Sequence, residues 1–206
     1  TRACLRAHTL LTYAGYACSE MLVAGYMKFM ENDFMGLTNA TQETRAIMAK
    51  YGQDGVHFDG HSRGAMTTGN ALESLAKDKT QLGQLPSLTV NFIGPAYNAS
   101  KADNLLSSLQ GRENMSPEQA AAAELKYQSH QADTVGGLIG WNKPTGGNLS
   151  EGKAIWQEWK DMLGKPATVH SCYGKGNTPC SDKKYWKESP SGIPEWRPAS
   201  FNSKKD

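Results

Sequence analysis

The sequence predicts an α/β fold, a small parallel sheet flanked by helices. Short apolar stretches rich in β-branched and aromatic residues alternate with longer stretches of helical periodicity, an order typical of parallel β-α-β units. At one junction Val56 and Phe58 precede the pentapeptide Gly60-His61-Ser62-Arg63-Gly64, and a helical stretch follows it. Only 55–60 and 88–93 have a full strand pattern, so we expect a small sheet.

Capping and breaking residues predict the bounds of the elements. Thr41 is expected to cap a helix over 41–51, and Ser116 followed by Pro117 predicts a helix that runs to about residue 126. Gly94-Pro95 ends the strand at 88–93. The other expected elements are helices over 9–30, 63–77, 102–110 and 149–163, loops over 31–40 and 78–86, a short strand or turn at 127–130, and an irregular tail from residue 166 onward.

Length and charge bound the class of protein. The chain has 206 residues, enough for one domain (1–206) with a good-sized core. We divide it into N-terminal helices (1–52), a core that carries the proposed chemistry (53–190) and an irregular tail (191–206). The net charge is +2, so nucleic acid is not expected as a partner. Because the chain opens with Thr1 rather than Met, we expect it to be the C-terminal part of a longer protein.

The apolar segment 9–30 is long enough to span a bilayer. Glu20 and Lys28 interrupt it and three tyrosines dilute it, which favours a buried or amphipathic helix. A helix that enters and permeabilises a membrane is the alternative.

The four cysteines include no C-x-x-C pair, so a structural zinc site is not expected. Cys172 and Cys180 bracket a loop that could close as a disulfide, which would suit an oxidising compartment such as a periplasm. Two free thiols are the alternative. No cluster of His, Asp or Glu has the spacing of metal ligands, and we expect neither a metal nor another cofactor.

A strand, Gly-x-Ser-x-Gly and a helix together are the layout of a nucleophile elbow, the sharp turn that exposes a serine above a sheet edge. Gly60 and Gly64 are expected to remove Cβ atoms that would clash with the strand and the helix. The helix after Ser62 directs its first N–H groups at the place where an oxyanion would form. We expect the backbone N–H of Arg63 to be one oxyanion donor and a second to come from residues 35–38.

A serine needs a histidine to take its proton and a carboxylate to orient that histidine. Behind an elbow of this kind the order along the chain is serine, acid, histidine. His130 and His170 follow the elbow, and we choose His170 because it lies in a Gly-rich loop region near the C-terminus. Asp133 lies between Ser62 and His170 and is our choice of acid. The lesser candidates for the acid are Asp103, Glu124 and Asp161.

Each of these residues also has a structural interpretation. His170 could be a surface-loop histidine, and Asp133 could cap the turn at 134–136. His57 alternates with apolar residues and could be a hydrogen-bonded core residue, and His61 is expected to point away from the serine. Residues that could line an acyl groove, or else belong to the core, are Phe34, Met66, Leu138 and Trp141.

Three blocks of the sequence resemble lipase-like toxin domains found at the C-termini of filamentous-haemagglutinin-type adhesins and type VI secretion effectors. The first block is His61-Ser62-Arg63-Gly64-Ala65-Met66-Thr67 with Gly69-Asn70-Ala71-Leu72. The second is His130-Gln131-Ala132-Asp133 with Val135 and Leu138-Ile139-Gly140-x-Asn142, and the third is His170-Ser171-Cys172-Tyr173-Gly174. Together they cover most of residues 56–186 in the family's order. The N-terminal part has no strand that matches the family's oxyanion loop.

The resemblance implies a reduced α/β-hydrolase-like fold and phospholipase or related esterase activity through Ser62, Asp133 and His170. It also implies a secreted effector that acts in the periplasm or at the membrane of a competing bacterium, and a cognate immunity protein that blocks the site. Two alternatives are a non-enzymatic binding domain that kept a hydrolase fold and a pore-type toxin that uses residues 9–30.

Overall fold

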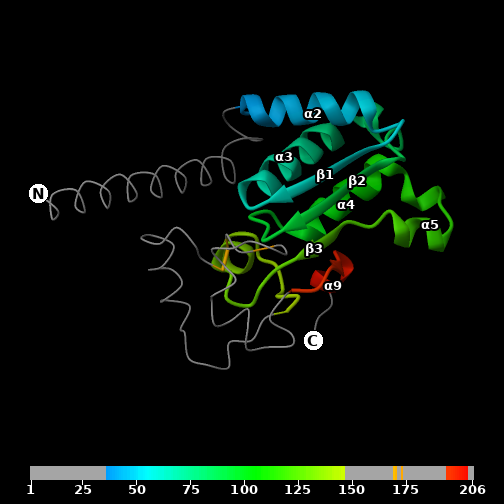
Figure 1. The fold of residues 1–206 in the computed structure, drawn as a ribbon. Coiled ribbons are helices and arrows are strands. Elements are labelled where there is room, and N and C mark those ends of the chain that lie inside the picture. Colours follow the sequence, from blue (N-terminus) through cyan, green and yellow to red (C-terminus); the bar gives the residue numbers. More distant parts are fainter. Residues whose placement is uncertain (1–35, 147–168, 171–172, 174–193, 204–206) are drawn as a thin grey trace, which may run out of the picture.

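The computed structural model describes residues 36–146, 169–170, 173 and 194–203. They form one four-stranded sheet in the order β1-β2-β3-β4, with helices packed against it (Figure 1). The first three strands are parallel, and β4 is antiparallel to β3. The predicted α/β fold with a small sheet flanked by helices is therefore confirmed, but the sheet is mostly parallel rather than wholly parallel as predicted.

The elements follow the alternation that the sequence predicts. The strands are β1 (Val56–His61), β2 (Leu88–Ile93), β3 (Lys126–Gln128) and β4 (Arg197–Pro198). The helices are α2 (Asn39–Tyr51), α3 (Arg63–Lys77), α4 (Ala99–Gln110), α5 (Pro117–Ala122) and α9 (Ser200–Ser203). Shorter turns are η1 (Lys79–Gln81), η2 (Arg112–Asn114) and the π-helical turn η3 (Val135–Ile139).

Side-chain caps explain where two helices begin. The helix α2 starts at Asn39 because the side chain of Thr38, and not the predicted Thr41, is the cap and accepts from the N–H of Thr41. The helix α4 starts three residues earlier than predicted, because the side chain of Asn98 accepts from the N–H of Lys101 at 2.9 Å. The bounds of α3 and β2 are those that the sequence predicts.

Tertiary contacts decide the elements that local signals miss. The helix α5 starts with the predicted Ser116 cap but ends at Ala122, because the N–H of Leu125 donates to Asp103 and the chain then enters β3. The prediction of an irregular tail is wrong for residues 197–203. There β4 pairs with β3, and the N–H of Ala199 donates to the carbonyl of Leu125 at 2.8 Å. The expected helices over 9–30 and 149–163 lie outside the described residues.

The core lies between one face of the sheet and the helices α3 and α4, which contact each other. On β2 the residues Leu88, Val90 and Phe92 are buried on this face, whereas Thr89 is exposed on the other. This alternation is the period of two expected for a strand with one covered face. The helix α2 packs on α3 as an outer layer.

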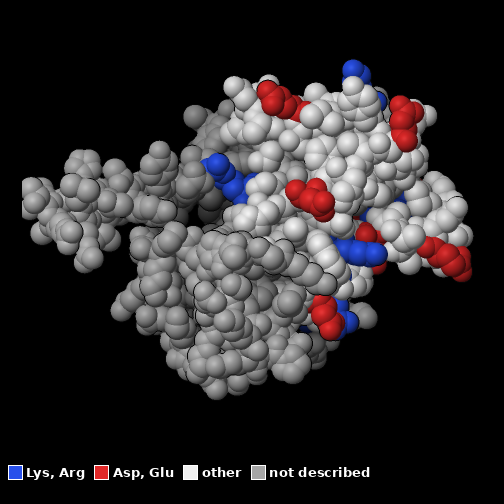
Figure 2. All heavy atoms as spheres, in the orientation of Figure 1, with Lys and Arg blue, Asp and Glu red and all other residues white. Residues whose placement is uncertain are grey.

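The charged side chains of the described residues form no large single-sign field on the face shown in Figure 2, where acidic and basic groups are interspersed. Within the part of the chain that the structure describes, no helix combines the length and apolar character needed to cross a membrane. The apolar segment 9–30 is not part of it.

Candidate active site

Ser62 lies in a strained turn at the carboxyl end of β1. Its backbone has φ 54° and ψ −119°, a region that L-residues rarely adopt. Three backbone hydrogen bonds fix this turn. The N–H of Ser62 donates to Ile93 at 3.1 Å, and the carbonyl of Ser62 accepts from Ala65 at 3.1 Å and from Ala96 at 3.2 Å. The strand β2 and the loop after it therefore hold the serine in place.

The two glycines of the pentapeptide differ in what they do. A Cβ atom on Gly60 would lie 2.8 Å from the Cα of Ala65 and 3.1 Å from the ring of Phe92, so only glycine lets the strand pass this close to the helix. Gly64 is exposed, and none of the described atoms outside its own turn lies within 4 Å of the position of a Cβ there. The predicted steric need for glycine is confirmed at Gly60 and wrong at Gly64.

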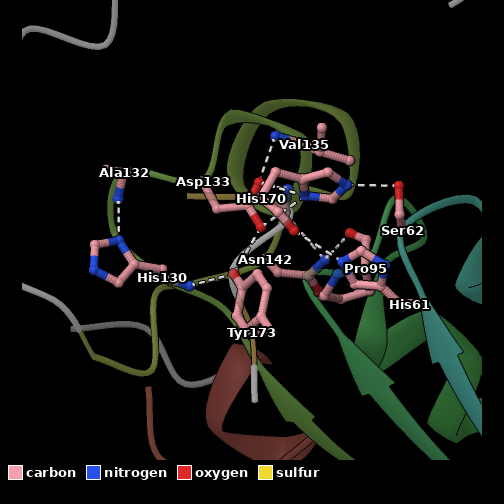
Figure 3. Close-up of polar contacts among 11 residues, drawn as sticks. His61, Ser62, Pro95, His130, Ala132, Asp133, Val135, Asn142, His170 and Tyr173 are labelled. Carbon is pink, nitrogen blue, oxygen red and sulfur yellow. Dashed lines mark hydrogen bonds and ion pairs between the residues drawn. The ribbon is translucent and has the colours of Figure 1, made fainter. Parts of the chain in front are cut away.

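The structure brings Ser62, His170 and Asp133 together in one hydrogen-bonded chain (Figure 3). The Nδ1 atom of His170 lies 3.0 Å and 3.1 Å from the two oxygens of Asp133, and its Nε2 atom lies 2.6 Å from the Oγ of Ser62. Because an ionised carboxylate only accepts, Nδ1 carries the proton and Nε2 is left to accept from the serine hydroxyl. The tautomer is the one that a general base at Nε2 requires.

Asp133 is a buried carboxylate whose side chain has 0 % exposure. The N–H groups of Val135 and Gly136 donate to its Oδ1 at 2.9 Å and 3.1 Å, and the hydroxyl of Tyr173 donates to its Oδ2 at 2.6 Å. Burial acts to raise the pKa of Asp133, but the Coulombic interaction with His170 and the hydrogen bonds outweigh it and hold the pKa below 3.8. The group is therefore ionised at neutral pH.

Tyr173 is a residue of the site to which the sequence alone assigns no role. Its hydroxyl also accepts from the N–H of His130 at 2.7 Å, so it joins Asp133 to the loop after β3. Gly94 makes room for it, since a Cβ there would lie 2.7 Å from Asp133 Oδ2 and 2.8 Å from the tyrosine ring. Burial, followed by the charge of Asp133, raises the pKa of Tyr173 well above 10, so the hydroxyl remains a donor.

The other histidines of this region have different surroundings. His130 is buried, and its Nδ1 accepts from the N–H of Ala132 at 3.0 Å. His57 is exposed and bonded to Thr89 and Asp59, so the suggestion of a core position is wrong. The ring of His61 stacks on the ring of His170, and the prediction that it points away from the serine stays a prediction.

The lesser candidates for the acid have other partners. Asp103 forms a buried ion pair with Arg112 at 2.7 Å, and Glu124 accepts from the N–H of Ser200 at 2.7 Å. Asp161 lies outside the described residues, as do Cys172 and Cys180. Asp133 contacts His170, so the choice of acid that the order along the chain predicts agrees with the geometry.

Two large apolar side chains are exposed beside the turn that carries Asp133. Leu138 is 54 % exposed and Trp141 is 73 % exposed, whereas Met66 is in the core. Trp141 has φ 55°, and its carbonyl accepts from the side chain of Asn98 at 2.9 Å. Phe34, the fourth candidate for an acyl groove, lies outside the described residues.

Arg63 is the first residue of α3, so its N–H belongs to the helix terminus next to Ser62. Of the segment 35–38, the structure describes 36–38, where the side chain of Thr38 caps α2. A second oxyanion donor from this segment stays a prediction. Among the described residues no three His, Cys, Asp or Glu side chains are grouped closely enough to hold a metal ion.

Comparison of the chain with protein-family models, with curated proteins and with solved structures finds no match. The roles of the residues therefore have to be argued from the geometry of the site and from the chemistry of the groups.

Replacing Tyr173 with Phe should lower the free energy of unfolding by about 1–3 kcal/mol, because a fully buried carboxylate and a backbone N–H each lose a partner. Tyr97→Phe is the matched control. Tyr97 also donates to a carboxylate, at 2.9 Å, but Glu73 is 19 % exposed and keeps its ion pair with Lys101. Urea unfolding should show a smaller loss for this control; equal losses would contradict the special role of the Asp133 contact.

Stability should depend on pH through His130. Burial lowers the pKa of His130 from 6.5 to about 4, so between these values the unfolded chain binds the proton and the folded chain does not. The free energy of unfolding should therefore decrease by about 2 kcal/mol from pH 7 to pH 5.

His130→Asn keeps an acceptor for Ala132 but cannot take a proton. In this variant the free energy of unfolding should decrease from pH 7 to pH 5 by no more than half as much as in the wild type. His61, whose pKa is lowered too, adds a smaller contribution of the same sign because it is exposed. Urea titrations of both proteins at the two pH values are the measurement. An equal decrease in the free energy of unfolding in both proteins would contradict the assignment to His130.

Proposed function

We propose that this protein is a serine hydrolase that cleaves carboxylic esters through Ser62, His170 and Asp133. The observation that supports it best is the continuous chain of contacts from the serine Oγ to His170 Nε2, at 2.6 Å, and from His170 Nδ1 to Asp133, at 3.0 Å. A serine in a strained turn, an imidazole in the matching tautomer and a buried ionised carboxylate are the groups that nucleophilic acyl transfer needs.

In the first half of the proposed reaction, His170 Nε2 takes the proton of Ser62 as Oγ attacks the ester carbonyl. Asp133 stabilises the resulting imidazolium, and the N–H of Arg63 donates to the oxyanion. The tetrahedral intermediate collapses, the alcohol leaves with the proton from Nε2, and an acyl-serine remains.

In the second half, a water gives a proton to His170 and attacks the acyl-serine. The acid is released, and the proton returns to the serine. Loss of a single oxyanion donor in enzymes of this kind costs on the order of 100-fold in rate.

The proposed substrate is a membrane phospholipid or a related acyl ester of a competing bacterium. The resemblance to lipase-like toxin domains supports this, as do the exposed Leu138 and Trp141 beside the turn of Asp133, which could contact acyl chains or a membrane surface. The same resemblance supports secretion as an effector, action in the periplasm or at the membrane of the target cell, and neutralisation by a cognate immunity protein.

Covalent labelling tests the chemistry. A fluorophosphonate should modify the wild-type protein at Ser62, and Ser62→Ala should abolish labelling and ester hydrolysis while changing the melting temperature little, because only one hydroxyl is removed. Mass spectrometry of the labelled peptide locates the adduct. A folded wild-type protein that never labels near neutral pH would contradict the proposal and favour the non-enzymatic binding domain.

Incubation with vesicles of mixed phospholipids tests the substrate. The expected result is release of fatty acid and the corresponding lysolipid, seen by mass spectrometry, which is absent with Ser62→Ala. Leakage of the vesicles that is equal for both proteins and accompanied by no cleavage product would instead support a permeabilising toxin that uses residues 9–30.

A further inference from the structure

His61 touches the segment that carries the proposed general base, although it belongs to a different part of the chain. It is the last residue of β1 and directly precedes Ser62, whereas His170 comes 109 residues later. Its Nε2 atom lies 2.9 Å from the backbone carbonyl oxygen of His170. The two imidazole rings are stacked, with centroids 5.0 Å apart and planes 23° from parallel.

We infer that His61 is a positioning residue for His170. The side chain of His61 holds the backbone carbonyl of His170 by a hydrogen bond and the imidazole of His170 by stacking. This inference rests on the proposed function, because it assigns to His61 an effect on the base and none on the substrate.

The hydrogen bond fixes the state of His61. A carbonyl oxygen only accepts, so Nε2 must be the donor and must carry a proton. This contact ties the His170 backbone to the turn of the nucleophile itself. The distance between Ser62 Oγ and His170 Nε2 is thus set by two neighbouring residues of one strand end, Ser62 and His61. That arrangement keeps the nucleophile and the base within hydrogen-bond distance even though they lie far apart in the sequence.

The stacked ring restricts His170 in a second way. Rotation of the His170 imidazole out of line with Ser62 would slide it against the face of the His61 ring. The ring of Tyr173 lies edge-on to that of His61, with centroids 6.0 Å apart. When His170 becomes an imidazolium, a neutral aromatic face at this distance is a favourable neighbour.

The groups that face His61 from the described elements are His170, Tyr173 and, at longer range, Asp133. Desolvation by the groups packed on one side of the ring, followed by the Coulombic interaction with His170, lowers the pKa of His61 below 6.5, and so the ring is uncharged at neutral pH. The residue as a whole is exposed, in contrast to Asp133. An exposed side chain contributes little to the free energy of folding, so its removal should act on the reaction more than on stability.

Three substitutions separate the two contacts. His61→Phe keeps a stacked ring without the N–H donor, His61→Gln keeps a donor near the position of Nε2 without the ring, and His61→Ala removes both. The matched control is His57→Ala, because His57 is an exposed histidine four residues earlier on β1 whose described partners are Thr89, Asp59 and Asn91. The readouts are the rate of fluorophosphonate labelling, kcat and KM for p-nitrophenyl acetate, and the melting temperature.

We expect kcat and the labelling rate to fall about fivefold to tenfold for His61→Phe and for His61→Gln, as for the loss of one hydrogen bond or a comparable contact. For His61→Ala both rates should fall on the order of 100-fold, because the base is then misplaced. KM and the melting temperature should stay close to the wild-type values, and His57→Ala should match the wild type. If the two contacts are separable, kcat and the labelling rate should be higher in His61→Phe and in His61→Gln than in His61→Ala.

The failure of this inference is distinct from the failure of the proposed function. If the wild-type protein labels at Ser62 but all three His61 variants keep kcat within about twofold, His61 does not position the base. If the melting temperature, KM and kcat of the His61 variants change together, the residue is structural and the inference is also wrong. A wild-type protein that does not label overturns the proposed function itself.

Discussion

The carboxylate of Asp133 is buried, ionised and bonded by two separate parts of the chain, and the geometry of the site depends on how its charge is satisfied. The N–H groups of the η3 turn supply two donors, and the C-terminal segment supplies His170 and Tyr173. An ionised carboxylate without such partners would be costly to bury. The requirement to satisfy this charge therefore brings His170 and Tyr173 to the ends of the strands.

The carboxyl ends of β1 and β2, together with the loop after β2, fix the position of Ser62 and make room for Tyr173. Backbone bonds from Ile93 and Ala96 hold Ser62 in its positive-φ turn, and Gly94 admits Tyr173 against Asp133. The loop between β2 and α4 thus contacts both the nucleophile and the acid. The side chain of Asn142 extends this link, because it donates to the carbonyls of Pro95 and Tyr97 and accepts from the N–H of Ala99. One buried amide joins the start of α4 to the chain that follows Asp133.

Much of this could be predicted from the sequence, where the signals are local. The bounds of α3 and β2 follow from periodicity and from flanking breakers. The contacts of His170 with Ser62 and with Asp133 follow from the residue types and their order. The predicted start of α4 is wrong because Asn98 is the cap of this helix. The sequence does not predict the pairing of β4 with β3, because two residues have no pattern of their own and pair only through tertiary contact.

The sequence also could not place Tyr173 or the ring of His61 in the site. Which neighbour a side chain meets depends on the direction in which a distant segment approaches, and no spacing rule encodes that direction. In the sequence Tyr173 is one of several residues close to His170, and no pattern gives it a role. Gly64 is an example of the opposite kind. It fits the Gly-x-Ser-x-Gly pattern, yet in the described structure a Cβ atom at this position would have open space around it.

The order of the site along the chain has a consequence for what a fragment can do. Ser62 and Asp133 both precede residue 147, whereas His170 and Tyr173 follow residue 168. A polypeptide severed between these points would divide into one piece with the hydroxyl and the acid and another with the imidazole, and neither piece by itself would contain all three groups of the site. A newly synthesised chain would likewise lack the assembled site until residue 173 had left the ribosome.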